Sequence, residues 1–224
     1  MSEGSTAKRV RRSKAEQRAE TLEQILDAAE YLFSMSGLHG VTLRDVAHRV
    51  GVHTTLLHYY FDDKRSLFEA VFARRAGVTS GRRMEALDHY EAQAGDHPTV
   101  EGALHAFLDT DLDLYLQGGE PWMNWGAFCA RVSNTIEGAA LMDVHFDPVV
   151  LKLVSILKRA LPDTPEEDIF WGYHFVTGSL MNTLARTGRI DRLSAGVCKS
   201  DDFMAVKQRM AKFMAAGFLA LSKS

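Results

Sequence analysis

Apolar side chains recur every three or four residues along most of the chain, which is the spacing of one face of an α-helix. The strict alternation of apolar and polar residues that marks a β-strand is absent from the sequence. Residues 16–36 show the helical pattern clearly, and one face of this segment carries Leu22, Ile25, Leu26, Ala29, Leu32 and Phe33. The pattern predicts an all-α protein with about nine helices.

Glycine and proline divide this pattern into separate helices. Gly37 is expected to end the first helix, and Asp62 or Asp63 to cap a helix that runs from about residue 64 toward 90. Further helices are expected at about 99–115, 122–136, 148–161, 164–187 and 201–221, with a loop or short turn at 188–200. We expect Asp147 and Thr164 to cap two of them, because each precedes a proline that suits a first helical turn.

Residues 41–67 read VTLRDVAHRVGVHTTLLHYYFDDKRSL and combine two short predicted helices with a tight turn. Thr42 is placed to cap the first helix, in which Val46 and Val50 lie one turn apart on one face. Gly51 can end this helix where the chain changes direction. Residues 53–59 can form a second helix, whose small polar start suits the major groove of DNA. The segment therefore predicts a helix-turn-helix in a DNA-binding regulator.

The sequence around this motif resembles the TetR family of transcriptional regulators. The matching residues are Gly37, Gly40, Val41, Thr42, Val46, Ala47, Gly51, Val52, Leu57, Tyr59, Tyr60, Phe61, Lys64 and Leu67. The resemblance implies an N-terminal three-helix DNA-binding domain and a C-terminal helical domain for ligand binding and dimerisation. His58 stands where the family usually has tyrosine, and an imidazole can also donate a hydrogen bond to phosphate.

Eight residues are candidates for contact with DNA: Thr42, Arg44, His53, Thr54, Thr55, His58, Tyr59 and Lys64. Thr42 can offer its hydroxyl and backbone N–H to a phosphate at a helix N-terminus. Arg44, Thr54 and Thr55 are the candidates to face base edges. His53, Tyr59 and Lys64 are placed to fix the register through phosphate contacts. Tyr59 has an equal alternative, which is to pack inside the domain as we expect Tyr60 and Phe61 to do.

The distribution of charge divides the chain more clearly than its net charge of −3 does. Residues 1–18 carry Glu3 and Glu16 against six basic residues: Lys8, Arg9, Arg11, Arg12, Lys14 and Arg18. Residues 76–224 carry 14 basic and 19 acidic residues. This distribution predicts a basic flexible arm at 1–18, a DNA-binding domain at 19–63 and an effector-binding and dimerisation domain at 64–224. The alternative for the arm is a charged tail that only aids solubility.

The middle of the C-terminal part concentrates aromatic residues with a few polar ones, as small-molecule pockets between helices do. The candidates for ligand contact are Phe107, Asp111, Tyr115, Trp122, Trp125, Phe128, Arg131, Phe146, Trp171, His174, Phe175 and Asn182. Arg131 and His174 are the candidates to orient an anionic or polar head group. The alternative is that these aromatic residues, taken one by one, belong to an ordinary core.

A second, scattered resemblance links the C-terminal part to a TetR branch in which some members answer to fatty acids or acyl-CoA thioesters. It is carried by residues 145–148, 160–162 and 165–167, by Trp171, His174, Phe175 and Gly178, and by residues 182–185. The resemblance implies a small apolar or amphipathic effector, such as a fatty acid or an acyl-CoA, that releases a repressor from its operator. The alternative is a C-terminal domain that binds a protein partner.

The last two predicted helices are expected to form a homodimer interface. Gly172, Gly178 and Ser179 would allow close helix approach, and Met214 and Phe218 widen the apolar surface of the final helix. Two such helices from each subunit would make a four-helix interface. A dimer would read the two half-sites of a pseudo-palindromic operator in double-stranded DNA. The alternative is that this apolar surface packs inside one subunit.

Other functions lack residues that could carry them. Cys129 and Cys198 form no disulfide framework, and the histidines show no spacing of metal ligands. The sequence has no catalytic Ser-His-Asp order, phosphate loop or carboxylate pair, so we expect no cofactor, no metal and no enzyme, even one joined to a DNA-binding domain. Neither a signal peptide nor an apolar run near the ~20 residues of a membrane helix is present, so we expect a cytoplasmic protein without membrane contact.

Overall fold

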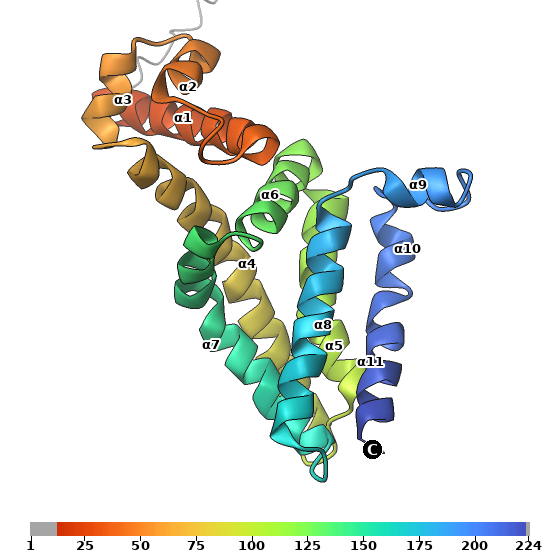
Figure 1. The fold of residues 1–224 in the computed structure, drawn as a ribbon. Helices are drawn as coiled ribbons and strands as arrows, with labels where there is room; N and C mark the ends of the chain where they lie inside the picture. Colours follow the sequence, from red (N-terminus) through yellow and green to blue (C-terminus); the bar gives the residue numbers. More distant parts are fainter. Residues whose placement is uncertain (1–12, 223–224) are drawn as a thin grey trace, which may run out of the picture.

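The computed structural model describes residues 13–222, which fold into helices joined by short loops and contain no β-strand. Three helices form a head at one end of the molecule: α1 (Lys14–Ser36), α2 (Leu43–Val50) and α3 (Thr54–Tyr60) (Figure 1). The remaining helices form the body: α4 (Lys64–Ala94), α5 (Val100–Gln117), α6 (Gly119–Val132), α7 (Ile136–Ala160), α8 (Glu166–Leu184), α9 (Arg189–Leu193), α10 (Phe203–Lys207) and α11 (Met210–Leu221). Nine of the helices within residues 13–222 have seven or more residues, which confirms the predicted all-α fold.

Local side-chain hydrogen bonds define the helix starts in the head. Thr42 caps α2 as predicted, because its hydroxyl accepts from the backbone N–H of Asp45 while the Asp45 carboxylate accepts from the backbone N–H of Thr42. Asp63 caps α4 in the same reciprocal way with Ser66. Gly51 follows α2 with a φ of +81°, a left-handed conformation that glycine adopts without strain.

The largest difference between the predicted and the observed helix boundaries concerns α7. We expected one helix to end at 136 and a new one to begin at Pro148 with Asp147 as its cap, but α6 ends at Val132 and α7 runs through Pro148. Proline inside a helix removes the hydrogen bond to the carbonyl four residues earlier. Here Val144 and Pro148 both lie on the exposed face of α7, where water can bind that carbonyl.

Three further details differ from the prediction. Pro165, not Thr164, is the N-cap of α8, and the Thr164 hydroxyl makes no hydrogen bond within residues 13–222. The final predicted helix is divided into α10 and α11 at Arg209, whose guanidinium donates to the carbonyl of Ala205 at 2.9 Å. The segment expected as a loop or short turn at 188–200 contains the short helix α9.

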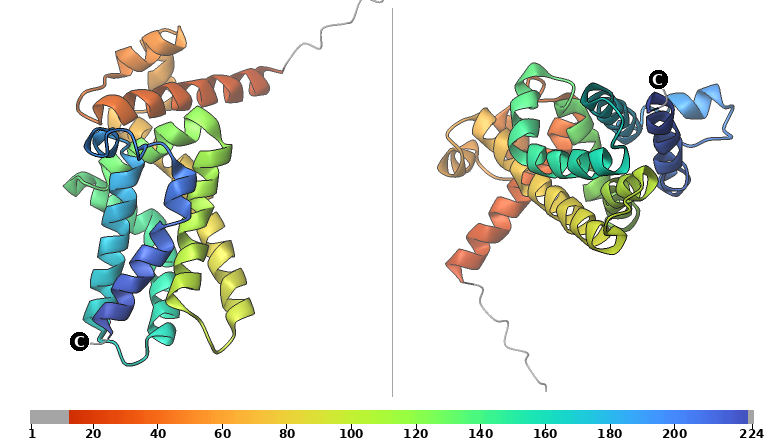
Figure 2. Two further views of the ribbon diagram at one scale, coloured as in Figure 1. Left: turned by 90° about the vertical axis from the view of Figure 1, so that its right-hand side faces the viewer. Right: turned by 90° about the horizontal axis from the view of Figure 1, so that it is seen from below.

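One continuous apolar core joins the head to the body. Phe33 of α1 stacks against Phe128 of α6, and both rings contact Phe68 of α4. Figure 2 shows α1 crossing the ends of the body helices, with α4 descending from the head beneath it. Packed side chains therefore transmit a displacement of α4 or α6 to the head.

Candidate DNA-binding surface and effector site

The predicted recognition helix α3 lies at the end of the molecule opposite the end of α11 (Figure 1). Thr55, His58 and Tyr59 are exposed on it, and Thr54 is half-buried. His53 precedes the helix and is exposed, although its side chain makes no capping hydrogen bond. The start of α3 therefore presents free side chains, as a helix that enters the major groove requires.

The neighbouring candidates flank this helix on both sides. Thr42 and Arg44 are exposed at the start of α2, and Lys64 is half-buried at the start of α4. The Thr42 hydroxyl donates to Asp45 at 2.6 Å. This hydrogen bond and the one from the Thr42 backbone N–H lower the pKa of Asp45. The structure thus brings all eight predicted DNA-contacting residues to one helix-turn-helix, within residues 42–64.

The three consecutive aromatic residues at the end of α3, residues 59–61, lie in different environments. Tyr59 is 61% exposed, and the Arg18 guanidinium lies 4.9 Å from the centre of its ring. The Tyr60 hydroxyl donates to the Arg18 carbonyl, and Phe61 is buried. Tyr59 is therefore placed at the surface, whereas Tyr60 and Phe61 pack within the head.

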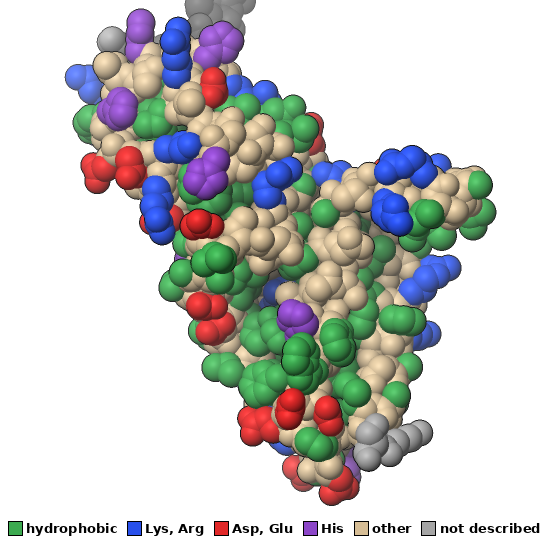
Figure 3. Space-filling view, viewed as in Figure 1, with side chains coloured by type: hydrophobic (Ala, Val, Ile, Leu, Met, Phe, Trp, Pro, Cys, Tyr) green, Lys and Arg blue, Asp and Glu red, His purple; other side chains and the backbone are tan. Residues whose placement is uncertain are grey.

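Basic side chains and histidines gather on the outer end of the head, where Figure 3 shows them in blue and purple. Four of the nine histidines in the sequence are exposed on the head: His48, His53 and His58, and also His39, which lies beside the body. Residues 1–12 of the predicted basic arm lie outside the described residues. Residues 14–18, predicted as the end of that arm, form the beginning of α1.

A buried carboxylate ties the head to the body. The Glu30 side chain on α1 is only 3% exposed, and its Oε2 accepts from Arg74 Nη2 and from Arg75 Nε, both at 2.9 Å. Arg74 also contacts Glu23 and Asp27 of α1 at 2.9 Å. Because both arginines belong to α4, the ion pairs couple the orientation of α1 to that helix.

Arg131, predicted to orient a ligand head group, lies instead at the junction of head and body. Its guanidinium donates to the carbonyls of Ser34 and Met35 at the end of α1, at 3.3 and 3.2 Å. These bonds satisfy two carbonyls that the helix end leaves without partners. Long-range contacts of this kind leave no pattern in the sequence.

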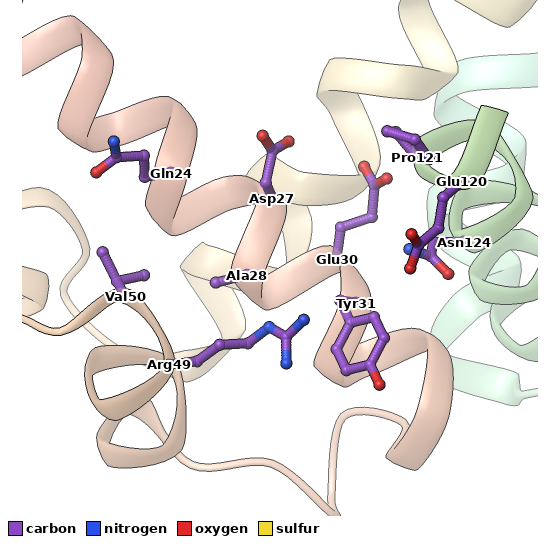
Figure 4. Close-up of a pocket in the computed structure, with 10 residues that line it drawn as sticks. All are labelled: Gln24, Asp27, Ala28, Glu30, Tyr31, Arg49, Val50, Glu120, Pro121 and Asn124. Carbon is purple, nitrogen blue, oxygen red and sulfur yellow. The ribbon is translucent and has the colours of Figure 1, made fainter. Parts of the chain in front are cut away.

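A pocket of about 430 Å³ lies at the same junction, between α1, the end of α2 and the start of α6. Figure 4 shows the side chains of Asp27, Glu30, Tyr31, Arg49 and Glu120 around it. The Arg49 guanidinium lies 3.7 Å from the centre of the Tyr31 ring. This pocket contains none of the twelve predicted ligand-contacting residues.

Apart from Arg131 and Trp122, the predicted ligand residues separate into two groups. Phe107, Asp111, Tyr115, Trp125, Phe128 and Phe146 are buried in the core of the body. Trp122 is half-buried, with the Arg75 guanidinium 4.9 Å from the centre of its ring. Trp171, His174, Phe175 and Asn182 lie exposed on the outer face of α8. The structure therefore does not bring the twelve side chains into one cavity.

The core group contains an ion pair that the sequence analysis missed. Arg83 of α4 donates through Nη2 to Asp111 Oδ2 of α5 at 2.6 Å, and both side chains are buried. Burial raises the pKa of Asp111 to about 6, although the Arg83 charge opposes this rise. Burial also raises the pKa of nearby Cys129 to about 12, so this thiol stays protonated. In the sequence, only the position of the Asp111 carboxylate on the apolar face of a predicted helix indicates that it needs a cationic partner.

The geometry of the head defines a helix-turn-helix transcriptional regulator. The sequence matches the family described as bacterial regulatory proteins, tetR family, over residues 25–71, and the tetracyclin repressor-like C-terminal domain over residues 105–217. The chain belongs to the TetR family, and its relatives are transcriptional regulators rather than enzymes.

Several known proteins are similar along most of the chain. The HTH-type transcriptional regulator BetI of Escherichia coli O17:K52:H18 (strain UMN026) is 26% identical over 166 residues, which cover 74% of this chain and 83% of BetI. HlyIIR, a hemolysin II transcriptional regulator, has a similar fold, with a TM-score of 0.57, 17% identity and coverage of 92% and 99%. The fatty acid degradation regulator FadR from Bacillus halodurans gives a TM-score of 0.53, 15% identity and coverage of 88% and 95%. No helix among residues 13–222 is long and apolar enough to cross a membrane.

Proposed function

We propose that this TetR-family regulator is a homodimeric repressor that a small apolar or amphipathic effector releases from its operator. The observation that carries the proposal is the path of α4, which begins beside the recognition helix and runs along the body to its far end. Glu30 binds two arginines of this helix, so a ligand that moves α4 also turns the head. The ligand can do so only if it binds the DNA-free arrangement more tightly.

An exposed aromatic face on α8 and α11 supports the dimer. A groove of about 540 Å³ between the two helices is lined by Phe175, Ser179, Phe213 and Gly217, among others. Phe175 is 54% and Phe213 75% exposed, and Figure 3 shows apolar side chains over α8. Apolar patches of this kind mark interaction surfaces. The interface would leave two recognition helices free to read the half-sites of a pseudo-palindromic operator.

Part of the small-residue pattern on α8 serves packing inside one subunit. A Cβ atom at Gly172 would lie 2.2 Å from the Phe218 ring of α11. Gly178, in contrast, is exposed and would meet no atom within 4 Å among the described residues. Gly178 is therefore the glycine that is available to a second subunit.

The resemblance to a fatty-acid-responsive branch makes a fatty acid or an acyl-CoA one form of the proposed effector. The alternative is that the aromatic face of α8 and α11 binds a protein partner, and no small molecule acts. As a regulator of DNA transcription, the protein is proposed to act in the cytoplasm.

Fluorescence anisotropy tests the proposal with full-length protein and a duplex selected from a randomised pool. We expect saturable binding that falls steeply with salt, because phosphate contacts release counterions. Dodecanoate and dodecanoyl-CoA then serve as effector probes, and release of the duplex by either one supports the fatty-acyl form. Binding without sequence preference would contradict the proposed function.

A further inference from the structure

Inside the body, Arg83 and Asp111 form a buried polar pair that is surrounded by apolar side chains. They are 5% and 2% exposed, and the one side-chain hydrogen bond that they make among the described residues joins Arg83 Nη2 to Asp111 Oδ2. Guanidinium and carboxylate can share two parallel hydrogen bonds, but here Arg83 Nε and Asp111 Oδ1 have no partner within residues 13–222. Thr79 Oγ1, one turn before Arg83 on α4, is also buried and without a partner in this part of the chain.

Buried polar atoms in folded proteins are nearly always hydrogen-bonded, so three such atoms in one place require an explanation. Nε and Oδ1 each lie two covalent bonds from an atom of the 2.6 Å contact. A single small head group can therefore reach both. One of these atoms is a donor and the other an acceptor, which sets the chemistry that would satisfy them.

The surroundings of the pair are aromatic. The Arg83 guanidinium lies 4.1 Å from the centre of the Phe107 ring and 5.6 Å from that of Phe146. Tyr115 is buried on α5, one helical turn beyond Asp111. The combination of flat apolar walls with a few convergent polar atoms is the usual composition of a small-molecule site.

We propose that Arg83 and Asp111 recognise the polar head of the effector, and that this head is an uncharged group that both donates and accepts. A hydroxyl or a primary amide on an apolar, preferably aromatic, body fits this description. It would donate to Asp111 Oδ1 and accept from Arg83 Nε. This inference rests on the proposed effector-responsive function and adds the chemical class of the effector. It favours an amphipathic effector with an uncharged head over a fatty acid or an acyl-CoA, whose head groups are anionic.

A charged head fits this site less well. The ion pair is already neutral, so a carboxylate would face Asp111 and an ammonium would face Arg83, and either would leave a net charge in an apolar interior. Both side chains of the pair are almost fully buried, so a ligand must separate α4 from α5 to enter. Since α4 also begins beside the recognition helix, binding at Arg83 acts on the helix that positions the head.

The test uses five probes of similar size: benzyl alcohol, benzamide, benzoate, benzylamine and ethylbenzene. Binding to full-length, DNA-free protein is measured by isothermal calorimetry and by the shift in Tm. We expect benzyl alcohol and benzamide to bind at least tenfold more tightly than benzoate and benzylamine, a difference of ~1.4 kcal/mol. Equal or tighter binding of benzoate, or no binding of any probe, would overturn the inference and leave a purely structural ion pair.

Variants locate the binding. The double variant Arg83→Met with Asp111→Leu removes both charges together, because removing one would strand the other in the core. We expect it to lose the preference for benzyl alcohol over ethylbenzene. The matched control is Lys207→Met with Asp113→Leu, which removes an ion pair between α10 and α5. The Lys207 Nζ and Asp113 Oδ1 atoms of this pair lie 2.6 Å apart, and the control is expected to keep the preference for benzyl alcohol. Retention of the preference by the Arg83/Asp111 variant would refute the assignment.

A DNA-binding assay on the same preparations separates this inference from the proposed function. If the wild-type protein binds its selected duplex but binds none of the probes, the inference fails and the DNA-binding function stands. If the probes bind as expected but never change DNA affinity, the site is correct and the effector-responsive function fails.

Discussion

Replacing Glu30 with Gln keeps the shape of the side chain and removes the charge that joins α1 to α4. Breaking one partner of a buried ion pair costs ~3–5 kcal/mol. The two arginines here are 18% and 17% exposed, and Arg74 keeps Glu23 and Asp27 at 2.9 Å. We therefore expect Glu30→Gln to lower the free energy of unfolding by about 2–3 kcal/mol, below the range for a fully buried pair.

Urea denaturation followed by circular dichroism measures this loss, and thermal melting should show a fall in Tm of roughly 4–12 °C. The matched control is Glu69→Gln. Glu69 pairs with Arg65 one turn away on α4, also at 2.9 Å, but both side chains are about half exposed or more. Such a pair contributes about 0.3–0.5 kcal/mol. Equal losses in the two variants would refute the argument that burial makes Glu30 the link between head and body.

Four further variants test the DNA site, the dimer and the core pair. Thr55→Ala should change base preference at one or two positions of each half-site by ~1–3 kcal/mol, whereas Lys64→Ala should weaken all sequences about equally; selection from randomised duplexes measures both. Gly178→Leu should give a monomer in sedimentation at micromolar concentration, because the added side chain obstructs helix approach. Burial raises the pKa of Asp111 to about 6, so its contribution to stability is present below pH 4 and is lost as the pH rises through 6. Asp111→Asn leaves Arg83 without its partner and lowers the stability at every pH. It should nevertheless abolish the further loss of roughly 2–3 kcal/mol in the free energy of unfolding that the wild-type protein shows between pH 4 and pH 7.

Each of these has an outcome that would contradict it. If Lys64→Ala shifts the selected motif while Thr55→Ala does not, the roles of the two residues are reversed. A wild-type protein that is already monomeric would refute the dimer, and Gly178→Ala controls for the change in helix propensity. If wild-type protein and Asp111→Asn show the same dependence of stability on pH, Asp111 does not titrate in the core as described.

Local patterns carried most of the fold that could be predicted. Thr42 and Asp45 lie three residues apart, and Gly51 follows the helix that they open, so the helix-turn-helix depends on neighbours in the sequence. The eight predicted DNA-contacting residues gather in the head for the same reason. The start of α7 was misjudged because Pro148 suits a first helical turn equally well, and only its exposed position in the fold decides between the two.

Contacts between distant residues could not be predicted in this way. Arg83 and Asp111 lie 28 positions apart, and Arg131 reaches carbonyls of residues 34 and 35. Backbone carbonyls have no sequence signature, so nothing marks Arg131 as a link between helices. The aromatic residues of the body were recognised as a group, but helical spacing alone does not tell a core position such as Phe128 from an exposed one such as Phe175.

The most direct test of the central claim is a selection of duplexes by the full-length protein from a randomised pool, followed by native mass spectrometry of the selected complex. The regulator described here should enrich a pseudo-palindromic sequence with two half-sites, bound by one or more pairs of chains. Enrichment of a single asymmetric site bound by one chain, or no enrichment, would contradict the account.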